Sequence, residues 1–261
     1  MNFEFKDKYN IDDVLNLLRI LRSDEGCPWD RVQTHKSIRD NFIEETYEAV
    51  DAIDKEDYEL LKEELGDVLM QVIFHSQMSE DENKFNFDDV CDNLVKKLIL
   101  RHPHVFGDVK ASNEKEALST WEESKMKLKN QELYSDTFSS VPNSLPSLVR
   151  SQKIQKRASK LGMDFRNINE VILKIQEELD ELKYSIDSND KENQYEELGD
   201  LLFSVVNAGR FLDINCEHAL YDSTDKFINR FRKVEQLCKE RNVDTKTASD
   251  SLIDSLWEEV K

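Results

Sequence analysis

The sequence "EETYEAV" at residues 44–50 is followed by "EELGDVL" at residues 63–69, and both stretches place acidic residues beside apolar ones. A second pair, "EELDELK" at 177–183 and "EELGDLL" at 196–202, repeats the arrangement. In each stretch two acids lie three residues apart, which puts them on one face of a helix, about one turn or ~5.4 Å from each other. The pattern predicts two pairs of acidic helices.

Each pair is predicted to fold as an antiparallel hairpin, because few residues remain for the turn between its two helices. In the first pair, Glu48 and Glu64 are each eight residues from position 56, and Glu45 and Asp67 are each eleven residues from it. Antiparallel helices therefore bring these four acids to matching heights along the hairpin.

The two hairpins belong to an internal repeat. A shift of 133 residues places the four acids of the first hairpin on Glu178, Glu181, Glu197 and Asp200 without a gap. Basic and aromatic positions repeat as well, after small changes in offset that loops can absorb: Lys97, Arg101 and Trp121 correspond to Lys226, Arg230 and Trp257. The chain is therefore interpreted as two copies of one helical unit.

Periodicity and capping residues predict the other elements of the first half. Asn10 can cap a helix that ends near residues 26–30, since two acids follow in its first turn. The remaining predicted helices of this half span about 37–53, 57–78 and 88–100.

The whole chain is predicted to be all-α. Only six Gly and four Pro occur in 261 residues, which disfavours strand-rich folds with their frequent turns. Residues 130–149 lose helical periodicity and are rich in serine. The sequence therefore predicts two tandem helical-bundle domains, 1–129 and 150–261, joined by a linker at 130–149.

The charge and the cysteines limit the possible partners and location. A formal net charge of −19 disfavours binding to a nucleic-acid polymer or to an anionic membrane. The four cysteines are scattered without CxxC spacing, so neither a zinc cluster nor a disulfide framework is indicated. The start of the chain lacks the apolar segment of a signal peptide, and no apolar run reaches membrane-spanning length. We expect a cytoplasmic protein.

The gathered carboxylates indicate a cation site. Like charges at this spacing repel by about 1 kcal/mol or more per close pair. Glu and Asp oxygens without His or Cys suit Mg²⁺, or Mn²⁺ in its place, and suit zinc or copper poorly. A di-iron bundle also pairs acidic helices, but its Glu-x-x-His is missing from both repeats. The candidate metal ligands are Glu178, Glu181, Glu197 and Asp200 in the second half and Glu45, Glu48, Glu64 and Asp67 in the first.

A helical bundle that holds Mg²⁺ is suited to the hydrolysis of phosphoanhydrides. Lys226 and Arg230 lie four apart on one predicted helix, where they can reach phosphates, and Lys174 lies one turn before two of the second-half acids. The alternative for each is solvated surface charge. Trp257 can stack on a base, although a lone tryptophan is more often a core residue.

An ordered set of motifs extends over nearly the whole chain. The first half carries "GCPWD", "QTHKSI", "EETYEAVDAI", "EELGDVLMQVIFH", "RHPHVFGD" and "WEESK". The second half carries "KIQKRASKLGMDF", "EELDEL", "EELGDLLFSVVNAGR", "DKFINRF" and "WEEVK". An isolated ExxE with ExxD is a weak signal, whereas this ordered set in tandem is specific. With these motifs the chain resembles the MazG family of nucleoside triphosphate pyrophosphohydrolases.

The resemblance implies an all-α protein, usually a homodimer, that uses Mg²⁺ to hydrolyse nucleoside triphosphates to the monophosphate and pyrophosphate. It implies that the ExxE and ExxD acids bind the metal and that Lys174, Lys226, Arg230 and Trp257 lie near the nucleotide. It also suggests clearing of nucleotide pools or of noncanonical nucleotides. Family members rely mainly on the second half, and here Asn41 replaces Lys174 in the first half.

Water could be oriented by Glu177 or Glu196, which are adjacent to candidate ligands, although one step along a helix turns a side chain about 100° away. Two other classes of function remain open. A nucleotide-sensing interaction module would bind the triphosphate without turnover. A structural helical repeat would carry these acids as surface charge only.

Overall fold

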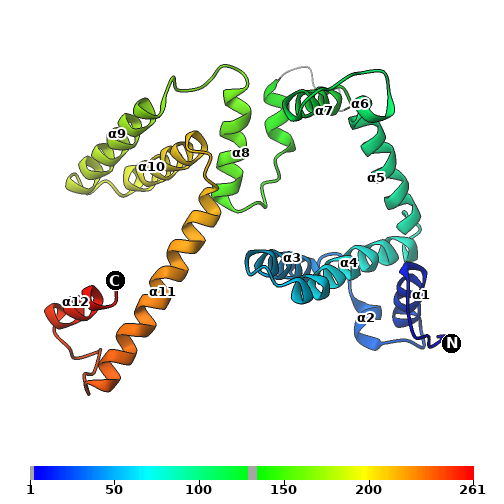
Figure 1. Ribbon diagram of the computed structural model, residues 1–261, viewed down its shortest axis with the longest axis horizontal. Helices are drawn as coiled ribbons and strands as arrows, with labels where there is room; N and C mark the ends of the chain where they lie inside the picture. The colour runs from blue at the N-terminus through cyan, green and yellow to red at the C-terminus, as the bar shows by residue number, and fades with distance from the viewer. Residues whose placement is uncertain (1–2, 129–133) are drawn as a thin grey trace. The chain divides into compact units, whose positions relative to one another are not determined.

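The computed structural model describes residues 3–128 and 134–261, including all side chains there except those of residues 115, 122, 123, 125–128, 134 and 135. All regular structure in these ranges is helical, which confirms the predicted fold class (Figure 1). The chain divides into two units, Met1–Lys125 and Met126–Lys261. None of the helices in the described part is long and apolar enough to cross a bilayer.

The first unit is built around one helical hairpin. Its elements are α1 (Ile11–Arg22), α2 (Pro28–Val32), α3 (Arg39–Asp54), α4 (Tyr58–Asp81), α5 (Phe87–Arg101), α6 (Pro103–Phe106) and α7 (Glu114–Leu128), the last of which runs past the division. The predicted cap holds: Asn10 accepts hydrogen bonds from Asp12 and Asp13, and the Asp13 carboxylate accepts one from the Asn10 backbone. The helix ends earlier than expected, at Arg22.

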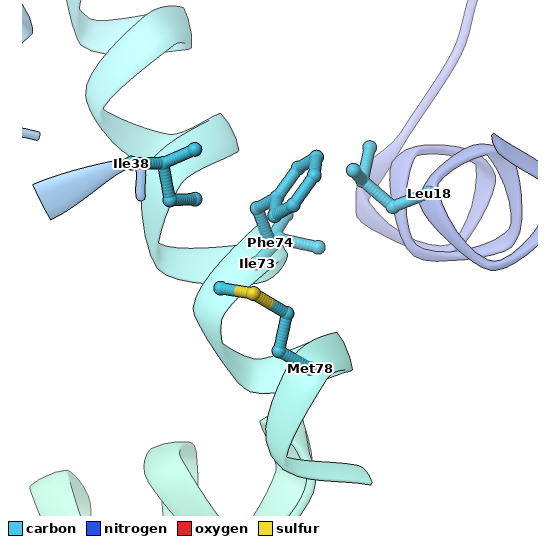
Figure 2. Close-up of a cluster of buried hydrophobic side chains, with 5 residues drawn as sticks. All are labelled: Leu18, Ile38, Ile73, Phe74 and Met78. Atoms are coloured by element: carbon cyan, nitrogen blue, oxygen red, sulfur yellow. The ribbon is translucent and has the colours of Figure 1, made fainter. Parts of the chain in front are cut away.

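The core of the first unit joins α1 and α4. Figure 2 shows Ile73, Phe74 and Met78 of α4 gathered with Leu18 and Ile38, and all five side chains are buried. His35, in the segment before α3, lies against α4 as well, with its Nδ1 2.7 Å from Nδ1 of His75. These contacts hold the start of the hairpin against the rest of the unit.

Both hairpins are closed by the same turn. In the first, the Asp57 amide donates to the Ala52 carbonyl and Glu56 lies in the left-handed region at φ 55°. In the second, the Asp190 amide donates to the Ser185 carbonyl and Asn189 has φ 54°. This long backward bond with a left-handed residue before it is a Schellman-type helix end. An aspartate then caps the returning helix, so chain reversal takes only a few residues.

The second unit repeats the plan. Its elements are the 3₁₀ helix η1 (Tyr134–Ser140), α8 (Ser147–Ser159), α9 (Ile168–Asp187), α10 (Lys191–Phe211), α11 (Cys216–Glu240) and α12 (Asp250–Glu259). The hairpin of α9 and α10 is the most extensive helix packing in the described residues, followed by that of α3 and α4. Residues 130–133 of the predicted linker lie outside the described residues, and the rest of it contains η1 and the start of α8.

A second apolar cluster joins α11 and α12. Val234, Cys238 and Leu256 are buried, and Trp257 packs against them. The Trp257 ring also lies 5.3 Å from that of Phe227, between ring centroids. Trp257 therefore has the core environment that the sequence left open as an alternative.

Candidate functional site

The second hairpin brings three of its four candidate ligands together. Carboxylate oxygens of Glu178, Glu197 and Asp200 all lie within 4.8 Å of one another. Glu178 comes from α9 and is buried, whereas Glu197 and Asp200 come from α10 and are half-buried and exposed. Asp200 opens an apolar run, which predicts a position of limited exposure at the edge of the seam between the two helices. This prediction is wrong, since Asp200 is exposed.

Glu181 stands next to this group rather than within it. Removal of water around its carboxyl raises its pKa, and the charges of Glu197 and Glu178 raise it further. The position one turn along α9 from Glu178 explains this proximity. The four acids of the second hairpin therefore concentrate negative charge, as their spacing in the sequence predicts.

Lys174 supplies the positive charge beside these acids. Its Nζ lies 2.8 Å from Oε1 of Glu177 and 2.8 Å from Oε1 of Glu178. The two carboxylates raise the pKa of Lys174 well above its ordinary value, Glu177 most strongly. Lys174 is thus cationic and bound to a candidate metal ligand.

The first hairpin also brings three of its four acids together, and here the fourth acid is Asp67. Oxygens of Glu45, Glu48 and Glu64 lie within 4.8 Å of one another. Loss of water contact raises the pKa of Glu45, and the charges of Asp67 and Glu48 raise it further. The pKa of Glu64 is raised in the same way, by lost hydration and then by Glu48 and Asp67. The charge of Asp67 therefore acts on this cluster, although Asp67 is not among the three acids within 4.8 Å of one another.

The two clusters have the chemistry of a hard divalent cation site. Every donor is a carboxylate oxygen, the ligand type that Mg²⁺ and Mn²⁺ prefer. Octahedral ligands at about 2.0–2.1 Å from Mg²⁺ lie about 3 Å apart when adjacent and about 4 Å apart when opposite. A spread of at most 4.8 Å therefore needs only small side-chain adjustments.

An open depression of about 560 Å³ adjoins the second cluster. Glu181 and Glu197 line it together with Glu177, Asp180, Tyr184 and Asn193. Sequence reasoning did not select Tyr184 or Asn193. The signal was present, because Tyr184 lies about one turn after Glu181, and Asn193 one turn before Glu197, on two antiparallel helices.

The two candidates for water orientation have different surroundings. Glu177 lines the depression and pairs with Lys174. Glu196 is exposed and, within the described residues, its side chain makes no hydrogen bond or ion pair. The structure therefore favours Glu177 over Glu196, although the sequence offered both as candidates for orienting water.

Lys226, Arg230 and Trp257 lie on α11 and α12 rather than on the acidic hairpin. Lys226 and Arg230 make no ion pair within the described part of the chain. Trp257 packs on α11 through Phe227 and the buried cluster. Within the described residues, these three side chains make no hydrogen bond or ion pair with the acids of α9 and α10.

Both hairpins lie in segments that are similar to known proteins. The model of the MazG nucleotide pyrophosphohydrolase domain matches twice, over residues 33–106 and 166–235. The nucleoside triphosphate pyrophosphohydrolase of Escherichia coli strain K12 is 41% identical over 96% of this chain and 97% of its own. The nucleoside triphosphate pyrophosphohydrolase/pyrophosphatase MazG of Thermotoga maritima is 41% identical over 96% of this chain and 95% of its own.

A third relative, the uncharacterized protein YabN of Bacillus subtilis, is 42% identical over 94% of this chain and 50% of its own length. The repeated match and the nearly complete coverage of two relatives agree with the duplicated acidic hairpin in the structure. The chain therefore belongs to the MazG nucleotide pyrophosphohydrolase family.

Proposed function

We propose that this protein hydrolyses nucleoside and deoxynucleoside triphosphates to the monophosphate and pyrophosphate, with Mg²⁺ bound by the acids of the second hairpin. The observation that carries the proposal is the convergence of Glu178, Glu197 and Asp200, with a lysine paired to Glu178 beside them. Nearly full-length relatives named for this activity support it. A role in clearing nucleotide pools or noncanonical nucleotides follows from the same resemblance.

The residues of the second hairpin have different proposed roles. Glu178, Glu181, Glu197 and Asp200 would hold the ion, which when bound would offset phosphate charge and lower the pKa of water. Lys174 would contact the phosphates, and Glu177, which lines the depression, would orient the attacking water. The water oxygen bonds to phosphorus as the α–β anhydride bond breaks, and a carboxylate or solvent accepts the proton.

Lys226, Arg230 and Trp257 remain proposed nucleotide contacts. The acids Glu45, Glu48, Glu64 and Asp67 remain a proposed second cation site. We also propose a homodimer in the cytoplasm. Apolar side chains exposed on α10 support the dimer, and the scattered cysteines support the location.

Product analysis tests the reaction. Purified protein with Mg²⁺ and each of the canonical triphosphates should give monophosphate and pyrophosphate in ³¹P NMR spectra. Diphosphate and orthophosphate would contradict cleavage between the α- and β-phosphates. Glu197→Gln should remove turnover, whereas Glu192→Gln, an exposed change of equal charge on the same helix, should leave it unchanged.

The same samples separate the competing functions. Tight triphosphate binding without turnover would favour the sensing module. Unchanged Mg²⁺ affinity in Glu197→Gln and Asp200→Asn would favour surface charge without a site. Rates on oxidised and deaminated nucleotides, compared with canonical ones, would define the substrate range.

A further inference from the structure

The buried carboxylate of the second cluster already has a cationic partner. The Glu178 side chain is 6% exposed, and its Oε1 lies 2.8 Å from Nζ of Lys174. Lys174 is more open, with 35% of its side chain exposed, and it also contacts Glu177. The ammonium group can therefore leave Glu178 without unfolding α9, whereas Glu178 itself is fixed.

An ammonium group and a divalent cation compete at such a carboxylate. Both seek the same oxygens, and the two positive charges repel one another when they share them. A bound polyphosphate changes this competition, because its oxygens give the lysine another anionic partner.

We propose that Lys174 is an exchangeable counterion, which holds Glu178 until nucleotide phosphate draws it away and thereby opens that carboxylate to the metal. This proposal rests on the function proposed above and deepens it. It makes metal binding and nucleotide binding support each other at the second site. Such coupling is reciprocal, so each ligand strengthens the other by the same factor.

The first hairpin provides an internal comparison. Asn41 stands where the second half has Lys174. Within the described residues, Glu45, Glu48 and Glu64 have no ion pair with a lysine or arginine. The first cluster therefore lacks an exchangeable counterion, and its metal affinity should not depend on nucleotide through this route.

Manganese binding tests the exchange directly. The full-length chain with Glu48→Gln and Glu64→Gln removes first-half ligands, so that the second site is measured alone. Mn²⁺ affinity is followed by electron paramagnetic resonance at pH 8 without nucleotide. Adding Lys174→Met should raise Mn²⁺ affinity by about tenfold, within the usual range of site-to-site coupling. The same change should weaken binding of a non-hydrolysable triphosphate measured in EDTA.

Two further variants isolate the mechanism. Lys174→Arg keeps the charge and should retain the parental Mn²⁺ affinity. Lys183→Met removes an equal charge from the same helix, but Lys183 pairs with Asp180 at 3.0 Å and not with Glu178. It should therefore leave Mn²⁺ affinity nearly unchanged. Circular dichroism of each variant checks that the helices remain folded.

The outcomes distinguish this proposal from the one it rests on. Unchanged Mn²⁺ affinity in Lys174→Met would make Lys174 a phosphate contact only, and weaker Mn²⁺ binding would make it a residue that positions Glu178. Either result overturns the exchange while wild-type turnover to monophosphate and pyrophosphate still stands. Absence of both Mn²⁺ binding and turnover in the wild type would overturn the proposed function itself.

Discussion

Asn41 and Lys174 occupy equivalent positions of the repeat, and the difference changes the charge balance of the two acidic clusters. In the second half, Lys174 offsets the buried charge of Glu178. In the first half, lost hydration and then like charges raise the pKa values of Glu45 and Glu64, and no lysine or arginine in the described residues pairs with these two acids. The second cluster is therefore better prepared to hold ionised carboxylates around a cation and a phosphate.

Matched substitutions should expose this asymmetry. Glu197→Gln should lower kcat by about a hundredfold or more, because it removes a ligand at the proposed catalytic ion. Glu64→Gln, at the equivalent position of the first half, should cost less than about fivefold if the second half dominates. Steady-state kinetics with saturating Mg²⁺ measures both. Equal losses in the two variants would contradict the asymmetry.

Glu181 should limit the stability of the metal-free protein. Its pKa is raised above 4.5 by lost hydration and by the charges of Glu197 and Glu178. As pH rises, this carboxyl ionises at a lower pH in the unfolded chain than in the folded protein. The folded state is therefore favoured below pH 4.5, and this contribution to its stability is lost as pH rises through the higher pKa of the folded state. Glu181→Gln removes this cost and should raise Tm at pH 7 in EDTA.

The control for that prediction is the neighbouring residue. Lys183, and then Gln176, lower the pKa of Asp180 through hydrogen bonds, so its ionised form is favoured by folding. Asp180→Asn should therefore not raise Tm in EDTA. Added Mg²⁺ should raise the Tm of the wild type more than that of Glu181→Gln, because binding to the folded state alone stabilises it. A lower Tm for Glu181→Gln in EDTA would contradict the predicted repulsion.

At the scale of elements, the two hairpin turns carry different residue types at the left-handed position. Glu56 and Asn189 have nearly the same left-handed φ, 55° and 54°. Asparagine adopts this region readily, whereas glutamate is strained there. Glu56→Asn should therefore stabilise the fold by about 0.5–1 kcal/mol, and Asn189→Ala should destabilise it by a similar amount.

Urea unfolding measures both changes in the turn. Glu59→Asn serves as the control, because Glu59 lies in the first turn of α4 with helical geometry and pairs with Lys62. It should give no gain in stability. If Glu56→Asn and Glu59→Asn shifted the unfolding midpoint equally, the left-handed turn would not be the cause.

The hairpins could be located from the sequence because helix-capping side chains mark the ends of their helices. Asp57 caps α4, and the predicted helix over 57–78 matches Tyr58–Asp81 at its start. The short helices α2 and α6 were not predicted, because the periodicity only indicated helix ends near residues 26–30 and 100. Pro28 and Pro103 each occupy the first turn of a helix there, and a proline can also follow the end of one. A proline alone does not distinguish these two cases.

The candidate site was predictable to the extent that it depends on the hairpin. Spacing within and between helices correctly predicted that Glu178 lies near Asp200 and Glu48 near Glu64. Glu181, which the spacing places level with Glu197, is not among the three acids that lie within 4.8 Å of one another. The pairing of Lys174 with Glu178 was not foreseen, since several acids lie within its reach and only side-chain packing selects among them. The exposure of Asp200 also depends on what covers α10, which periodicity does not specify.

At the scale of the whole molecule, many large apolar side chains are exposed within the described residues. Leu198, Leu202 and Val205 follow an i, i+4, i+7 stripe on α10 and are 48%, 52% and 46% exposed.

This stripe supports the proposed homodimer and makes it testable. A second copy that packs on α10 would bury these side chains, and helix–helix packing of such a stripe is driven by apolar burial. Leu202→Glu places a charge at its centre and should convert the dimer to a monomer of 30.7 kDa in light scattering coupled to size exclusion. Leu252→Glu puts the same charge at an exposed apolar position of α12 and should leave the dimer intact.

Light scattering tests separately whether the dimer forms and whether α10 forms its interface. A wild-type monomer at micromolar concentration would contradict the dimer. A wild-type dimer that survives Leu202→Glu would move the interface away from α10, because a buried unpaired carboxylate costs more than the surrounding apolar contacts return. Since Glu197 and Asp200 lie on the same helix, loss of the dimer should also alter Mn²⁺ binding at the second cluster, which links assembly to the site.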